Sequence, residues 1–248
     1  MIHDKIKNII LSYFIDNRIK NINKVQQNPF SYQKKVLKKL LSKSLNTEFG
    51  VEHKFDEIND YHSFKKNIPL RTYEEFFEYI KKCKSGAKNI LWPGKIRCFA
   101  KSSGTTNSNS KYIPVTQDSL NKCHYKVGKD MLCLYSHNYP NKKKLYNGYG
   151  LMLGGSLSKG NRSYLEGDLS AILLENFPFW VKYHRLPDYN TAIMNNWKEK
   201  IERISNQVID KNITNLTGVP SWMLILLQTI LKKSGKKNIL EVWPNLEL

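Results

Sequence analysis

The sequence predicts an α/β protein in which a mainly helical N-terminal region precedes a sheet covered by helices. In residues 1–90, apolar side chains recur at helical spacing. In residues 91–248, short apolar runs bounded by Gly and Pro alternate with helical patterns, as in an α/β sheet. Hydrophobic residues make up 40% of the 248 residues and aromatic residues 12%, so the chain has enough apolar mass for a packed core and global disorder is excluded.

The N-terminal helices are expected at 2–22 and at about 31–45, where Ile and Leu fall on one side. A third helix is predicted to begin after Thr72. Thr72 and Glu75 have the spacing of a capping box, in which both side chains accept hydrogen bonds from backbone N–H groups of the first turn.

In the second part of the chain, helices and strands interleave. Strands are predicted at 96–100, 112–115, 149–153, 213–218 and 239–243, and helices at 118–135, 168–174, 191–208 and 222–233. Gly235 suits the C-cap of the last helix. The strand at 239–243 lies at the very end of the sequence, where it would lack a following neighbour to pair with. We therefore expect the chain to be cut within its domain, with an open strand edge that favours aggregation.

The chain is strongly basic, with 40 Lys+Arg against 21 Asp+Glu and a formal net charge of +19. Such a charge raises nucleic acid as a partner. The basic residues are mostly lysines scattered along the chain in pairs. The chain is also rich in Asn and Ile, and a coding bias toward A- and T-rich codons would produce this composition. Solvated lysine faces are therefore favoured, and a basic nucleic-acid-binding module stays the alternative.

No metal site, membrane span or secretion signal is predicted. Four cysteines have no CxxC spacing and no histidines at ligand spacing, so reduced thiols are favoured over zinc ligands. No apolar run approaches the ~20 residues needed to cross a bilayer. The charged N-terminus lacks a cleavage site of small residues. We expect a cytoplasmic protein without membrane contact.

The segment 101–111 (KSSGTTNSNSK) carries the most chemistry. Its hydroxyl groups can donate to phosphate oxygens, a glycine lets the backbone N–H groups approach an anion, and Lys111 adds positive charge. The predicted phosphate-binding residues are Ser102, Ser103, Gly104, Thr105, Thr106 and Lys111. The segment is no Walker A loop, since GxxxxGK[ST] is absent. From composition alone, a polar hairpin loop between two antiparallel strands is slightly favoured over a phosphate site, since Ser, Thr, Asn and Gly dominate ordinary turns.

The order of these residues resembles the phosphate loop of adenylate-forming enzymes. Further sequence motifs resemble more specifically those of the bacterial branch of the auxin-responsive Gretchen Hagen family. The series runs in order over nearly the whole chain. Its words are WPG at 92–94, FAKSSGTT at 99–106, SKYIPVT at 110–116, LGGS at 153–156, GDLSAI at 167–172, GVPSWM at 218–223 and EVWPNLE at 241–247. One departure is Asn107-Ser-Asn-Ser110, where many such loops have Gly; Asn tolerates left-handed backbone, so the departure is mild.

The resemblance implies an acyl-acid–amido synthetase on a three-layer adenylate-forming large-domain fold. Such enzymes join a carboxylic acid to ATP with Mg²⁺, and an amino acid then attacks the acyl-adenylate and releases AMP. The second and third nucleotide motifs of the family are not found in this sequence. We therefore expect the N-terminal part of the large domain only, without its C-terminal half and the mobile cap domain. The chain is then expected to be one of three things: a weakly active or inactive form of the enzyme, a non-catalytic fragment, or one half that needs a second polypeptide.

Other residues have less specific interpretations, and no catalytic residue is assigned. Val219, Trp222 and Met223 follow a predicted strand and could line an acyl pocket, although core packing suits Trp222 and Met223 better. Asp168 with Glu166 could act as an acid–base pair, but a helix N-cap is favoured for Asp168. No catalytic role is assigned to the histidines at 53, 62 and 124.

Overall fold

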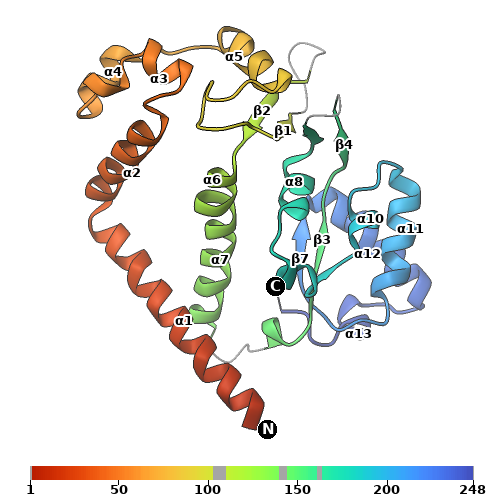
Figure 1. The fold of residues 1–248 in the computed structure, drawn as a ribbon. Coiled ribbons are helices and arrows are strands. Elements are labelled where there is room, and N and C mark those ends of the chain that lie inside the picture. Colours follow the sequence, from red (N-terminus) through yellow and green to blue (C-terminus); the bar gives the residue numbers. More distant parts are fainter. Residues whose placement is uncertain (1, 103–109, 140–143, 161–163, 248) are drawn as a thin grey trace. The chain divides into compact units, whose positions relative to one another are not determined.

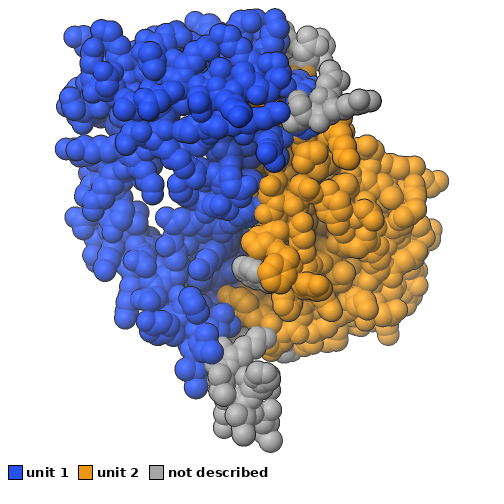
Figure 2. Space-filling model, in the orientation of Figure 1, with its two compact units in different colours: residues 1–98, 111–139, 161–164 blue, residues 99–110, 140–160, 165–248 orange. Residues whose placement is uncertain are grey.

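A computed structural model describes residues 2–102, 110–139, 144–160 and 164–247 (Figure 1). The chain divides into two compact units, coloured separately in Figure 2. Unit 1 comprises residues 1–98, 111–139 and 161–164, and unit 2 comprises residues 99–110, 140–160 and 165–248. Both units are therefore assembled from segments that are far apart in the sequence.

Unit 1 is mainly helical. Its elements are α1 (Ile2–Gln27), α2 (Pro29–Ser44), α3 (Glu48–Glu52), η1 (Phe55–Glu57), α4 (Tyr61–Asn67), α5 (Tyr73–Ser85), β2 (Tyr112–Val115), α6 (Gln117–Ser119), η2 (Leu120–His124) and α7 (Tyr125–Asn138). The helices predicted at 2–22 and 31–45 are confirmed as α1 and α2. The capping box of Thr72 and Glu75 is confirmed at the start of α5.

Two packing contacts organise unit 1. The Arg18 guanidinium of α1 donates to both carboxylate oxygens of Asp130 on α7, with 2.7 Å between Nη2 and Oδ2. Leu41 of α2 packs against Phe55 and Ile58, and these three buried side chains form a small apolar core. The first contact ties α1 to a helix more than a hundred residues later in the sequence.

The helix predicted at 118–135 has an irregular start. α6 begins at its N-cap Thr116, whose hydroxyl accepts from the Ser119 N–H, and it runs into the π-helical turn η2 before α7. Asp118 on α6 pairs with Lys43 of α2 and with Lys122, 2.8 Å away. These two ammonium groups hold the pKa of Asp118 down at about 2.

Unit 2 contains a parallel sheet in the order β6-β3-β7. Its elements are β3 (Tyr149–Leu153), β4 (Leu157–Lys159), β5 (Leu165–Gly167), α8 (Leu169–Glu175), α9 (Phe179–Lys182), β6 (Arg185–Leu186), α10 (Tyr189–Ala192), α11 (Trp197–Val208), β7 (Ile213–Gly218), α12 (Pro220–Ser234) and α13 (Ile239–Val242). β1 (Cys98–Lys101), β5 and β4 are neighbours in a second sheet, in which β4 and β5 pair antiparallel.

The main core of unit 2 lies between the parallel sheet and two helices. Side chains from β3, β7, α11 and α12 meet there and are almost fully buried; they include Leu151, Leu153, Ile204, Val208, Ile213, Leu226 and Ile230. Figure 1 shows α11 and α12 on the same side of β3 and β7. The α/β fold class predicted from the sequence is confirmed, with the strands at 112–115, 149–153 and 213–218 in place.

Two predicted elements are wrong. The strand at 239–243 is the short helix α13, because the Asn238 side chain accepts from the Leu240 N–H and starts a helical turn. Trp243 after this helix is buried in the core, and its indole N–H donates to the Val208 carbonyl at 3.1 Å. The open strand edge expected there therefore does not exist. The helix at 191–208 is two helices, because Asp188 and Asn196 each cap a separate start.

The four cysteines, all among the described residues, form no disulfide bonds in the structure, and three of them are buried. Within the part of the chain that the structure describes, none of the helices has the length and the apolar run that crossing a bilayer requires.

Candidate functional site

The predicted phosphate loop follows β1 and precedes β2, between strands as the sequence predicted. Ser102 is half-buried at its upstream end. Ser103, Gly104, Thr105 and Thr106 lie outside the described residues. Antiparallel pairing of the two flanking strands stays a prediction. The described residues of the loop resume at Ser110, so the contacts below are those of its downstream end.

Lys111 at this downstream end contacts the first turn of α5. Its Nζ lies 3.6 Å from Oε1 of Glu74 and 5.2 Å from the centre of the Tyr73 ring. The Lys111 side chain is 43% exposed. The pKa of Glu74 is lowered, chiefly because its carboxylate accepts from its own backbone N–H, and the charge of Lys111 adds to the effect. The ammonium group is thus open to solvent on one side and held by α5 on the other.

The next residue, Tyr112, is bound to the same helix. Its backbone N–H donates to the Tyr73 hydroxyl at 2.8 Å, and its ring lies 3.2 Å from Nζ of Lys84 in the last turn of α5. Lys84 also lies 4.9 Å from the ring centre of Tyr164. Together these contacts fasten the start of β2 to α5, whose own start is fixed by the capping box at Thr72.

The carboxyl ends of the parallel strands form the second candidate region. β3 ends opposite Gly218, the last residue of β7. A Cβ on Gly218 would lie 3.0 Å from both the Leu153 carbonyl oxygen and Cε of Met223, so the strand and the start of α12 approach closely there. In open α/β sheets this edge is where ligands bind.

The three predicted substrate residues lie at this edge with different exposure. Val219 is 46% exposed, Met223 is only 8% exposed in the core, and Trp222 packs against the core with its ring 5.1 Å from that of Trp197. Core packing is thus observed for Met223 and in part for Trp222. A share of these residues in an acyl pocket stays a prediction.

A buried lysine that sequence reasoning missed organises the turn after β3. Lys200 of α11 is 2% exposed, and its ammonium donates to the carbonyl oxygens of Gly154 and Gly155 at 2.7 Å each. Burial lowers the pKa of Lys200 to about 8, and the charge of Asp168 opposes this shift. The burial of Lys200 could have been predicted from its position in the sequence. It is four residues before the buried Ile204 and therefore lies on the same face of the helix.

The backbone N–H groups of the same turn are also occupied. Gly155 donates to the Ser170 hydroxyl at 3.0 Å, and Ser156 donates to the Asp168 carboxylate at 2.8 Å. Asp168 is the N-cap residue of α8, as favoured, but its carboxylate binds Ser156 rather than the helix. This contact gives Asp168 a structural role and argues against an acid–base pair with Glu166.

His53 also has a structural environment. The ring is buried and stacked on Phe49, with Nδ1 2.9 Å from the Phe49 carbonyl oxygen and Nε2 2.8 Å from Nη2 of Arg71. Since a carbonyl accepts and a guanidinium donates, Nδ1 carries the proton and Nε2 accepts. Both nitrogens are therefore occupied and unsuited to general-base work.

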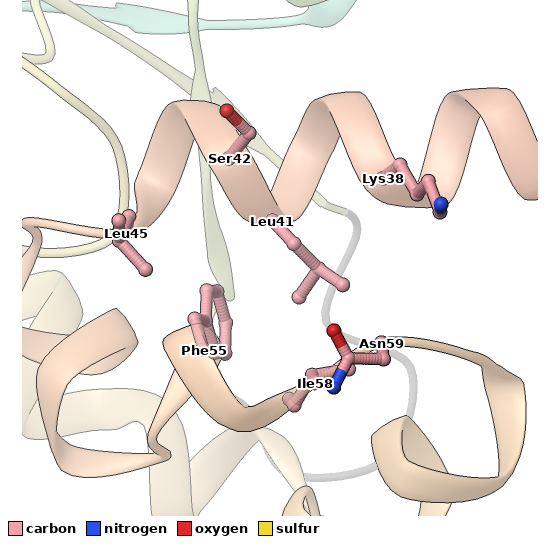
Figure 3. Close-up of a pocket in the computed structure, with 7 residues that line it drawn as sticks. All are labelled: Lys38, Leu41, Ser42, Leu45, Phe55, Ile58 and Asn59. Atoms are coloured by element: carbon pink, nitrogen blue, oxygen red, sulfur yellow. The ribbon is translucent and has the colours of Figure 1, made fainter.

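A cavity of about 290 Å³ lies in unit 1, away from the predicted loop in sequence. Figure 3 shows Leu41 of α2 and the C-cap residue Leu45 on one side, with Phe55 and Ile58 on the other. The polar residues at this cavity are Lys38, Ser42 and Asn59. A mainly apolar lining with a single cation is unsuited to a triphosphate, so the cavity is no candidate for the nucleotide. Among the described residues there is also no cluster of three acidic, His or Cys side chains that could hold a metal.

Comparison of the sequence with known proteins identifies its family. The profile described as the GH3 family N-terminal domain matches residues 18–248. Indole-3-acetic acid-amido synthetase GH3.2 of Arabidopsis thaliana is 30% identical over 131 residues, 52% of this chain and 24% of that protein. Indole-3-acetic acid-amido synthetase GH3.4 of the same plant is 32% identical over 105 residues, 42% of this chain and 18% of that protein.

Solved structures agree on the fold. AtGH3.15 acyl acid amido synthetase in complex with 2,4-DB superposes with a TM-score of 0.69 at 22% identity, covering 88% of this chain and 38% of that one. The chain thus spans well under half the length of the relatives and structures that it matches.

Proposed function

The chain belongs to the GH3 family, and on that premise we propose that it provides the phosphate-binding part of an ATP-dependent acyl acid–amido synthetase. The proposed reaction joins a carboxylic acid to ATP and passes the acyl group to an amino acid. The observation that carries the proposal is the position of the loop 102–111 between β1 and β2. Its last residue, Lys111, has an ammonium group that pairs with Glu74 of α5.

The donor set suits a polyphosphate. Hydroxyl groups of Ser102, Ser103, Thr105 and Thr106 would donate to phosphate oxygens, and Gly104 would let the backbone approach. Lys111 would neutralise charge that shifts onto pyrophosphate as it leaves, and donors held in advance at that position lower the barrier. Mg²⁺ bound to the nucleotide would share this charge.

The acyl acid is proposed to bind at the carboxyl edge of the β6-β3-β7 sheet. Val219 offers an exposed apolar side chain there, and the start of α12 carries Trp222 and Met223 beside it. The fixed turn after β3 gives this edge a rigid wall. Which acid and which amino acid take part is not specified by these residues.

We further propose that the similarity is to the bacterial branch of the family and that groups outside these 248 residues hold the adenosine end of the nucleotide. The sequence words that would contact adenine and ribose are not found in this chain. ATP would then be held at its phosphates only. Several missing hydrogen bonds of ~0.5–1.5 kcal/mol each would weaken binding by orders of magnitude. Free thiols at all four cysteines fit a reducing compartment such as the cytoplasm.

The experiment is an ATP–Mg²⁺ titration of the purified chain and of Thr105→Ala, followed by calorimetry or by NMR. We expect weak binding that Thr105→Ala weakens several-fold further, and little pyrophosphate release with a panel of carboxylic acids. Equal binding by both proteins would contradict the phosphate-loop assignment. Robust turnover by the chain alone would contradict the proposed division of the nucleotide site.

A further inference from the structure

Lys111 has partners that belong to neither the loop nor a ligand. Its ammonium lies between the Glu74 carboxylate, 3.6 Å away, and the face of the Tyr73 ring, 5.2 Å from its centre. Both residues belong to the first turn of α5, whose position is fixed by the capping box of Thr72 and Glu75. A lysine at an exposed loop end is thereby held in one direction by two residues of a rigid helix.

The choice of partner matters because Glu74 and a phosphate compete for the same ammonium. A carboxylate beside the lysine neutralises the charge that an anion would use, and it repels the anion as well. The Glu74 side chain is 65% exposed, so the pair is accessible to solvent and exchangeable rather than buried. An incoming polyphosphate can therefore take the ammonium from Glu74 without unfolding anything.

Tyr73 adds a second contact at the same point. Its hydroxyl accepts the backbone N–H of Tyr112 at 2.8 Å, so one side chain supports both the ammonium of Lys111 and the backbone of the residue after it. The backbone N–H of Tyr112 therefore has a hydrogen-bond acceptor within the protein and does not depend on water for one. When the ion pair with Glu74 is broken, the cation–π contact with the Tyr73 ring still favours the present position of the Lys111 ammonium.

We propose that Glu74 is an exchangeable counter-ion of Lys111, released when the polyphosphate of a nucleotide binds, and that Tyr73 is the positioning residue for the downstream end of the loop. This inference rests on the proposed function, because it assumes that Lys111 meets phosphate. It adds that the affinity for the nucleotide is held down by a carboxylate of the protein itself. Removing that carboxylate should strengthen binding, which a purely structural salt bridge would not predict.

The test compares ATP affinity of the wild type with Glu74→Gln, and uses Glu78→Gln as the matched control. Glu78 lies on the same helix and pairs with Lys81 at 3.7 Å, so both variants change the net charge equally. We expect Glu74→Gln to bind ATP about two- to five-fold more tightly than Glu78→Gln, the range of an exposed ion pair. The gain should shrink at high salt.

A Lys111→Met background separates this inference from the proposed function. In that background Glu74→Gln should tighten binding less than it does beside Lys111, because the ammonium that it releases is gone and only the repulsion between Glu74 and the anion is removed. Equal affinities of the two Gln variants, or a gain of the same size with and without Lys111, would overturn the inference. Lys111→Met binding ATP as well as the wild type would overturn the phosphate role of Lys111 itself, and the inference with it. Tyr73→Phe should weaken binding while keeping the ring contact, and unchanged binding would refute the role of its hydroxyl.

Discussion

Replacing Lys200 by methionine removes a buried charge while keeping most of the side-chain volume. In the wild type the ammonium donates to the carbonyl oxygens of Gly154 and Gly155, and the side chain is 2% exposed. Methionine leaves both carbonyls without that donor. Lys198→Met is the matched control, because Lys198 lies on the same helix turn, is exposed, and changes the net charge equally.

Two opposing contributions set the magnitude. Two buried carbonyls that lose their partner cost about 1–3 kcal/mol each. Against this, lowering the pKa from 10.5 to about 8 means that holding the ammonium in the folded state costs roughly 3 kcal/mol at neutral pH. At pH 7 the two contributions largely cancel, and we expect the free energy of unfolding of Lys200→Met to lie between about 1 kcal/mol above and about 3 kcal/mol below that of the wild type.

The pH dependence has a definite sign. Between pH 8 and pH 10.5 the unfolded chain keeps the proton on Lys200 while the folded chain has lost it, so stability rises with pH. A neutral amine still donates two hydrogen bonds, so both carbonyls stay satisfied. The wild type should therefore gain up to roughly 3 kcal/mol over Lys200→Met as the pH rises from 7 to 10.

The assay is urea unfolding of the three proteins at pH 7, 8, 9 and 10. Fluorescence is a suitable signal, since Trp197, Trp222 and Trp243 all belong to unit 2. Other groups titrate equally in each protein and cancel in the difference. A stability difference between wild type and Lys200→Met that stays constant over this range, as expected for Lys198→Met, would refute the reasoning.

Two further predictions concern stability. Asp118 has a folded pKa of about 2 from its pairs with Lys43 and Lys122, so its contribution is present above pH 4 and is lost as the pH falls through 2. Because these side chains are partly exposed, Asp118→Asn should cost only ~0.5–1 kcal/mol at pH 7 and nothing below pH 2, measured by unfolding at both; an equal loss at both would contradict it. Trp243→Phe should cost about 1–3 kcal/mol in urea unfolding, because the Val208 carbonyl loses its buried donor, and an unchanged midpoint would show that this bond contributes nothing.

Periodicity along the chain predicted the longest helices and the longest strands correctly, and it missed short elements such as α3, α4, β4 and β5. The buried strand 149–153 and the helix after Gly218 are read from runs of apolar residues, and the start of α5 from two side chains three positions apart. These features depend on neighbours within one or two turns. The phosphate loop is predicted for the same reason, since its residues are contiguous.

The element at 239–243 shows where such reasoning ends. Its apolar run with a β-branched residue and an aromatic fits a strand, but the Asn238 side chain accepts from the Leu240 N–H and the Trp243 indole finds the Val208 carbonyl. The second partner lies 35 positions earlier in the chain. A short apolar run has no strong preference of its own, so such contacts decide its form.

The sequence by itself determined the family and the α/β class, and it located the predicted phosphate loop, because each is encoded in contiguous residues or in their period. Only the tertiary structure decided that Lys200 is buried on the carbonyls of Gly154 and Gly155, and that Lys111 rests on Glu74. A lysine looks alike in sequence whether it faces water or a carbonyl. Its role depends on groups brought near by folding from 45 and 37 positions away, and no local pattern carries that information.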